Sequence, residues 1–157
     1  MWKQSDRDST GPKGSTGSFC WLLLPEAHVF AATRWVQKQI LDAYPNLNLE
    51  VYAVWVPILR GDKKKRVSRA AKTLVDRWVV HYWDGDQQVG KWFRENLTPD
   101  YSGKVQWDAF FLYDRDAQWS PSSPPVEEVW GRTIIGQSKK LTQALRRITG
   151  KKEFIEE

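Results

Sequence analysis

Cys20 is the only cysteine in the sequence, and its thiol is the side chain best suited to nucleophilic or redox chemistry. A single thiol cannot form an intramolecular disulfide or a CxxC pair, and zinc sites of four cysteines, or of two cysteines and two histidines, are excluded. Cys20 precedes the apolar segment 21–24, a predicted buried strand, so it lies away from the helix N-terminus that would lower its pKa. We therefore expect a structural thiol, with a reactive Cys20 as the alternative.

His28 follows that strand, where the next segment begins a helix. The positive end of a helix disfavours a protonated imidazole, so a neutral His28 could act as a base or as a weak metal ligand with Glu26. No nucleophile stands beside it, and two ligands do not complete a metal site. A surface or packing position is therefore the simpler interpretation.

Residues 81–86, HYWDGD, come nearest to a metal-binding cluster, because His81, Asp84 and Asp86 are close in sequence. Imidazole and carboxylate groups at such spacing can converge on a hard or borderline cation. However, Asp84 followed by Gln87 also has the spacing of a helix capping box, with Asp in place of Ser or Thr. We therefore predict a capping role and no metal site.

The run KKKRVSRAAK, from Lys63 to Lys72, concentrates positive charge in a chain whose formal net charge is +5. Clustered Lys and Arg attract phosphates. These residues open a predicted helix, where the dipole favours negative charge, and no nucleic-acid-binding signature accompanies them. We interpret the run as a solvated helix face and keep nucleic-acid binding as an alternative.

A long loop, RDAQWSPSSPP, spans residues 115–125 and contains Trp119 between polar and proline-rich flanks. Long loops in small domains often carry function. Trp119 could anchor a partner peptide, or it could fold back onto the sheet. Both interpretations stay open at this point.

The composition of the 157-residue chain, with 41% hydrophobic and 27% charged residues, is typical of one globular domain. Residues 1–19 are polar and rich in Gly, Ser and Thr, which predicts a flexible arm before a folded domain over 20–150 and a tail over 151–157. No apolar run reaches the length of a membrane span, and no secretory signal is recognised. We expect a cytoplasmic protein whose ten tryptophans mostly pack in the core.

Apolar spacing alternates between strand-like and helix-like segments along the chain. Strands are predicted at residues 21–24, 49–59, 78–83 and 107–114 and within 126–136, and helices around 29–43, 67–74, 89–97 and 138–149. Ala43 and Ala71 are placed on the inward faces of the first and second helices. The order β-α-β-α-β-α-β-β-α predicts an α/β fold, with a mainly parallel sheet flanked by helices on both faces and an antiparallel final pair.

Four stretches, VQKQILDAYP, VYAVWVPIL, HYWDGDQQVGKWF and WDAFFLYDRDAQW, resemble segments of a bacterial thioredoxin-like family. The resemblance spans roughly residues 21–149 and implies a thioredoxin fold. Redox-active members of that family carry a CxxC motif between the first core strand and helix, and a cis-proline before the strand that corresponds to residues 107–113. Here PEAHVFAA and Lys104–Val105–Gln106 occupy these places, so we expect a degenerate, redox-inactive member.

The resemblance implies a binding groove between two segments that the fold brings together. These are the start of the first helix and the turn before Trp107. We therefore expect a protein- or peptide-binding module without a cofactor, and oligomeric state stays open. The expected contact residues are Glu26, His28, Val29, Phe30, Gln106 and Trp119. The enzymatic alternatives are a thiol-dependent reaction at Cys20 or a transferase-like reaction with an anionic cosubstrate near the first helix.

Overall fold

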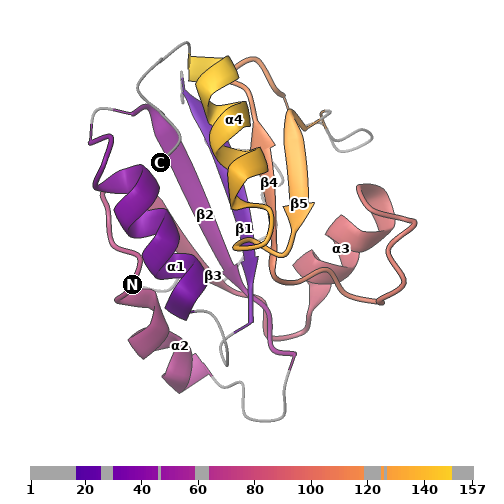
Figure 1. The fold of residues 1–157 in the computed structure, drawn as a ribbon. Coiled ribbons are helices and arrows are strands. Elements are labelled where there is room, and N and C mark those ends of the chain that lie inside the picture. The colour runs from indigo at the N-terminus through magenta and orange to yellow at the C-terminus, as the bar shows by residue number, and fades with distance from the viewer. Residues whose placement is uncertain are drawn as a thin grey trace.

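A five-stranded mixed sheet forms the centre of the computed structural model (Figure 1), which describes residues 17–25, 30–45, 47–58, 64–118, 125 and 127–149. The strands are β1 (Ser18–Leu24), β2 (Leu49–Trp55), β3 (Val79–Trp83), β4 (Ala109–Tyr113) and β5 (Val129–Arg132). Their order in the sheet is β3-β2-β1-β4-β5. β1, β2 and β3 pair in parallel, whereas β4 pairs antiparallel with both β1 and β5. The predicted element order and the antiparallel final pair are confirmed.

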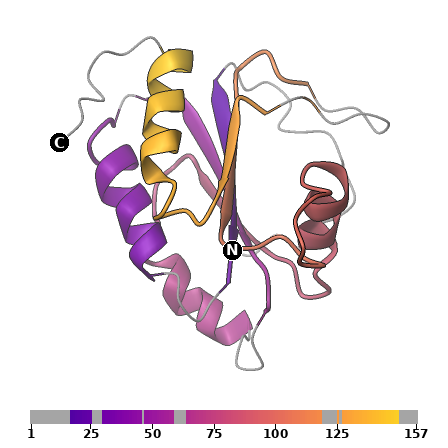
Figure 2. The ribbon, with the colours of Figure 1, turned by 45° about the vertical axis from the view of Figure 1, so that its right-hand side comes forward.

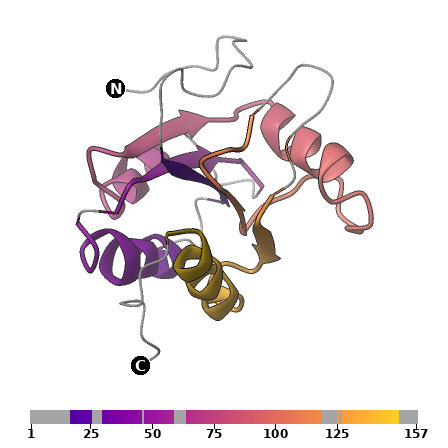
Figure 3. The same ribbon diagram turned by 90° about the horizontal axis from the view of Figure 1, so that it is seen from above.

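The helices divide unequally between the two faces of the sheet. They are α1 (Phe30–Val36), continued by the π-helix η1 (Gln37–Leu41), then α2 (Lys64–Ala71), α3 (Gln88–Asn96) and α4 (Ser138–Thr149). Figure 2 shows α1, α2 and α4 on one side of the sheet and α3 on the other. In Figure 3, seen from above, α1 and α4 lie side by side against the sheet, away from α3. Helices therefore cover both faces, as predicted.

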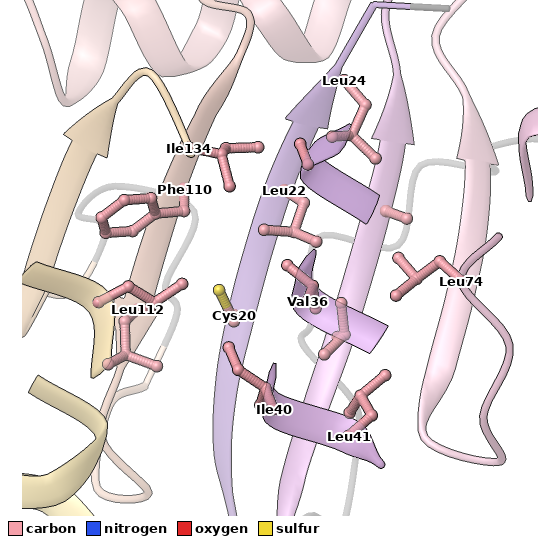
Figure 4. Close-up of a cluster of buried hydrophobic side chains, with 14 of the residues drawn as sticks. Cys20, Leu22, Leu24, Val36, Ile40, Leu41, Leu74, Phe110, Leu112 and Ile134 are labelled. Carbon is pink, nitrogen blue, oxygen red and sulfur yellow. The ribbon is translucent and has the colours of Figure 1, made fainter. Parts of the chain in front are cut away.

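The central strand β1 is buried on both of its faces. Cys20, Leu22 and Leu24 alternate toward the face covered by α1, α2 and α4, where they pack with Val36 and Ile40 of the first helix (Figure 4). Full burial of one such aliphatic side chain contributes about 1.5–3 kcal/mol. Phe19 and Leu23 are buried on the opposite face, and this double burial explains why residues 19–24 are an unbroken apolar run.

The opposite face of the sheet carries a row of aromatic side chains. Tyr52, Trp21, Phe111 and Trp130 are directly paired across four adjacent strands. Trp21 stacks on Tyr52 with ring centroids 4.7 Å apart, and Phe93 of α3 packs 4.7 Å from Phe111. The row accounts for several of the aromatic residues expected to pack, because offset and tilted ring contacts add to their burial.

Two predicted strand boundaries are wrong near the site. β1 begins at Ser18 rather than at residue 21, because main-chain pairing with Leu49 continues three residues further than the apolar pattern. Cys20 therefore lies within the strand, and residues 18 and 19 belong to the sheet. β4 begins only at Ala109, because Asp108 has a φ of 48°, a left-handed conformation outside the extended range of a strand.

The first helix also ends earlier than its apolar stripe. Ala32, Val36 and Ile40 are buried at helical spacing, but Ala43, predicted to face inward with them, is exposed. The helix closes with the π-helical turn η1 at Leu41, which takes the buried position instead. A π-turn shifts the regular spacing of an α-helix, so the extrapolated stripe fails there. In α2, likewise, Ala70 is buried and Ala71 is only half-buried.

Candidate functional site

One edge of the sheet collects the segments that the sequence singled out. β1, β2 and β3 are parallel and therefore end at this edge, and Ala109, the first residue of β4, pairs there with both Leu23 and Arg132. The connection from α3 to β4 runs into it (Figure 1). In open α/β sheets, ligands bind outside the carboxyl ends of the parallel strands. This edge is therefore the place to search for a site.

Residues 101–108, called here the 101–108 turn, are fixed to α3 by hydrogen bonds to the main chain of the turn. The Nε of Arg94 donates to the carbonyl of Gly103 at 2.9 Å and to that of Tyr101 at 3.3 Å. The amide of Gln106 donates to the carbonyl of Gly90 at 2.9 Å. A Cβ on Gly90 would lie 2.5 Å from a methyl carbon of Val105, so helix and turn approach closely only because position 90 is glycine.

Gln106, expected as a contact residue, is fully buried beneath the turn, with 0% of its surface exposed. Its side-chain amide donates to the hydroxyl of Thr98 at 3.3 Å. Its Oε1 has no hydrogen-bond partner among the described residues. Gln106 therefore supports the turn from below, and its side chain does not face a partner.

The main chain of the turn is not fully hydrogen-bonded at its centre, at Lys104 and Val105, among the described residues. Lys104 is exposed and Val105 is half-buried. Within the described part of the chain, the main-chain amide and carbonyl groups of these two residues form no hydrogen bond. The turn contains no proline and, among the described residues, no cis peptide precedes β4. The expected lack of a cis-proline is thus accompanied by a trans segment whose main-chain groups at Lys104 and Val105 have no partner in the described part of the chain.

Arg132, at the end of β5, was not singled out by the sequence. Its guanidinium carbon lies 4.8 Å from the ring centroid of Tyr101 and 4.8 Å from that of Trp107. Its Nε donates to the carbonyl of Trp107 at 3.1 Å. A lone arginine after a strand gives no sequence signal, because its partners stand 25 or more positions away and meet it only through strand pairing.

Cys20 lies in the core rather than at this edge. It is 3% exposed, and Figure 4 shows its sulfur among aliphatic side chains on the face of β1 that α1, α2 and α4 cover. Burial raises the pKa of the thiol to about 12, although a main-chain hydrogen bond with Phe111 opposes the shift. A thiol with so high a pKa is protonated near neutral pH and is a poor nucleophile.

His81 is held by hydrogen bonds to both ring nitrogens. The indole Nε1 of Trp55 donates to Nδ1 at 3.1 Å, and Nε2 lies 2.9 Å from the carbonyl of Leu74. An indole can only donate, so Nδ1 must accept and Nε2 carries the proton. Burial lowers the pKa of His81, which favours this neutral form. Metal binding through either nitrogen would require breaking one of these bonds.

Asp84 has the predicted capping role. One carboxylate oxygen accepts from the amide of Gly90 at 3.0 Å, and the amides of Gln88 and Val89 also bond to this side chain. Burial raises the pKa of Asp84 against these bonds. The reciprocal half of the predicted capping box is wrong, because the Gln87 side chain donates to the carbonyl of Pro57 instead.

Asp86, the third residue of the suggested metal cluster, is exposed. Within the described ranges, no group of three or more His, Cys, Asp or Glu side chains could hold a metal ion.

The basic run forms the solvent side of α2. Lys64, Lys65, Arg66 and Arg69 are exposed, whereas Val67 and Ala70 of the same helix are buried. The helix thus shows an ordinary amphipathic division between a charged face and a packed face. Lys72, just beyond the helix, is also exposed, and Lys63 lies outside the described residues.

The other half of the expected groove lies largely outside the described residues. This applies to the expected contact residues Glu26, His28, Val29 and Trp119. Phe30 is the first residue of α1, and its side chain is not described.

No helix in the described part of the chain is both long and apolar enough to cross a membrane.

Comparison with known proteins identifies the fold. No family model and no curated protein matches the chain. A solved thioredoxin-like protein in its oxidized form superposes with a TM-score of 0.53 at 16% identity, over 83% of this chain and 78% of that one. The chain has a thioredoxin-like mixed α/β fold and a single cysteine.

Two further solved structures superpose less closely. A secreted Mycobacterium tuberculosis disulfide oxidoreductase, homologous to E. coli DsbE, has a TM-score of 0.49 at 12% identity, over 85% of this chain and 83% of that one. A putative thioredoxin from Neisseria meningitidis has a TM-score of 0.45 at 18% identity, over 87% and 80%.

Proposed function

On the premise of this thioredoxin-like fold, we propose that the protein is a redox-inactive binding module. It holds an extended protein or peptide segment against the 101–108 turn. The main-chain groups of Lys104 and Val105, which form no hydrogen bond to any described residue, carry the proposal. Main-chain amides and carbonyls are strong hydrogen-bonding groups, and an extended segment can satisfy them by pairing as an added strand.

The rigidity of the turn supports such pairing. Arg94 and Gly90 fix the main chain on either side of Lys104, and Arg132 fixes it at Trp107. A partner that binds a pre-ordered segment loses less conformational entropy than one that must order a loose loop. The open main chain is therefore prepared for a ligand.

The presence of a single cysteine supports binding without dithiol chemistry. Thiol–disulfide exchange by a CxxC protein needs an accessible thiolate and a second thiol that resolves the mixed disulfide. This chain has one thiol, Cys20, which is buried and whose pKa is raised to about 12.

Two substitutions at one position test the main-chain pairing. Peptides selected from a random library on the immobilised protein serve as ligands, and their affinities are measured by calorimetry. Lys104→Pro removes the side chain and the main-chain N–H, whereas Lys104→Ala removes the side chain alone. Loss of one hydrogen bond costs about 0.5–1.5 kcal/mol, so we expect Lys104→Pro to bind roughly two- to tenfold more weakly than Lys104→Ala.

Chemical-shift mapping of the same peptides shows where they bind. The proposal requires the amide shifts to cluster over the 101–108 turn, in a protein whose other resonances show an intact fold. Equal affinity of the two Lys104 variants, or shifts confined to the exposed face of α2, would contradict it.

A further inference from the structure

Arg132 is a pre-oriented cation at the edge of the proposed groove. Two rings of the 101–108 turn, those of Tyr101 and Trp107, lie within 4.8 Å of its guanidinium carbon, and its Nε is bonded to the carbonyl of Trp107. Contact with aromatic faces and one fixed hydrogen bond restrict the rotation of the side chain. The guanidinium therefore has a defined position before any ligand arrives.

The terminal nitrogens of this guanidinium have no hydrogen-bond partner among the residues that the structure describes. Among the described residues, the Nε bond is the one hydrogen bond of the Arg132 side chain, and the ion pair between described residues joins Arg147 and Glu128. Asp108, beside the residue that pairs with Arg132, directs one carboxylate oxygen to the amide of Ile134 instead. A half-buried cation without a counter-ion is unusual, because partly buried charges are normally paired.

We infer that Arg132 binds a carboxylate of the polypeptide that occupies the 101–108 turn, either an acidic side chain or a free C-terminus. A carboxylate is planar and matches the fork of N–H donors on the two terminal nitrogens of a guanidinium. Arg132 contacts Tyr101 and Trp107, which flank Lys104 and Val105 in the same turn, so one extended segment can reach both the guanidinium and these amides. This inference rests on the proposed function and adds the chemical class of the ligand.

The test uses the side-chain Nε–Hε resonance of Arg132 in the wild-type protein, at constant ionic strength. The probes are acetyl-Gly-Glu-amide, its neutral counterpart acetyl-Gly-Gln-amide, and acetyl-Gly-Gly with a free carboxylate. We expect a saturable shift with the side-chain carboxylate, the terminal carboxylate or both, and none with the Gln peptide. An Arg132 resonance that responds to none of them, or equally to Glu and Gln, would overturn the inference.

Three variants separate a specific contact from general charge screening. Arg132→Gln should weaken binding of the carboxylate probe about tenfold or more, and Arg132→Lys should restore only part of it, because an ammonium lacks the fork geometry. Arg147→Gln makes the same charge change on exposed α4 and should leave binding unchanged. Equal weakening by Arg147→Gln would overturn the inference, and melting temperatures establish that each variant is folded.

The two proposals can fail separately. Selected peptides that distinguish Lys104→Pro from Lys104→Ala but leave the Arg132 resonance unmoved would support the binding module and remove its carboxylate preference. A saturable Arg132 shift with no difference between the Lys104 variants would leave a carboxylate site and remove the strand-like pairing.

Discussion

Cys20 and the 101–108 turn are opposite cases within one small domain. Cys20 has the most reactive side-chain type in the chain, yet it is buried among aliphatic groups and its pKa is raised to about 12. The turn contains no thiol, yet its main chain at Lys104 and Val105 and the terminal nitrogens of neighbouring Arg132 have no intramolecular partner in the described part of the chain. This difference is why we propose the turn, and not the thiol, as the binding surface.

The largest effect is expected from a cavity in the buried cluster around Cys20. Phe110 is fully buried in that cluster, and Phe110→Ala should lower the free energy of unfolding by about 3–5 kcal/mol. Ile135→Ala, at a residue 44% exposed, should change it by less than about 0.5 kcal/mol. Urea denaturation measures both. Iodoacetamide should label Cys20 faster in Phe110→Ala than in the wild type, and an unchanged labelling rate would mean that burial does not protect the thiol.

An intermediate effect is expected from removing the hydrogen bonds that fix the 101–108 turn to α3. Arg94→Leu removes the donor that bonds the carbonyls of Tyr101 and Gly103, and hydrogen bonds from charged groups contribute about 1.5–3 kcal/mol each. Exchange of the hydrogen-bonded amides of Tyr101 and Gln106 should accelerate accordingly, while exchange in β1 and β2 stays slow. Lys91→Leu, at an exposed position of the same helix, is the control. Equal acceleration in the control would show that Arg94 does not hold the turn.

A smaller, pH-dependent effect is expected at His81. Its pKa in the folded protein is lowered below the ordinary 6.5, so above pH 6.5 the imidazole is neutral in both states and contributes no pH dependence. Below that value the unfolded chain binds the proton first, and the free energy of unfolding falls by up to about 1.4 kcal/mol per pH unit until the folded pKa is reached.

Denaturation at several pH values, with two variants, isolates this contribution. His81→Phe should remove the slope between pH 6.5 and the lowered folded pKa, although it also costs Trp55 its hydrogen-bond acceptor. His28→Gln removes the only other imidazole of the chain and should retain the slope. A slope that survives in His81→Phe would exclude His81 as its source.

Most of the fold was predictable because burial repeats along the chain. β2 is apolar on both faces, α4 has Leu141 and Leu145 at regular spacing, and the absence of a helical pattern between β4 and β5 indicated their antiparallel pairing. Two errors arose where local geometry departs from regular spacing, at the π-turn η1 and at Asp108 with its positive φ. A third arose at the start of β1, where main-chain pairing extends beyond the apolar segment.

The candidate site was only partly predictable. The turn before Trp107 was singled out through the family resemblance, but Gln106 was expected to contact a partner and is buried. Arg132 and Tyr101 carried no local signal, since their contact depends on β5 pairing with β4 and on Arg94 fixing the turn. Such a site is assembled by tertiary structure, and short sequence motifs do not encode it.

Hydrogen exchange at the amides of Lys104 and Val105 is the most direct measurement of the central claim. These amides have no hydrogen-bond partner in the described part of the chain, so they should exchange rapidly in the protein alone. Saturation with a selected peptide should slow the exchange of at least one of them while amides of the core strands keep their rates. Unchanged exchange at both positions under saturating peptide would contradict the proposal that this main chain holds the ligand.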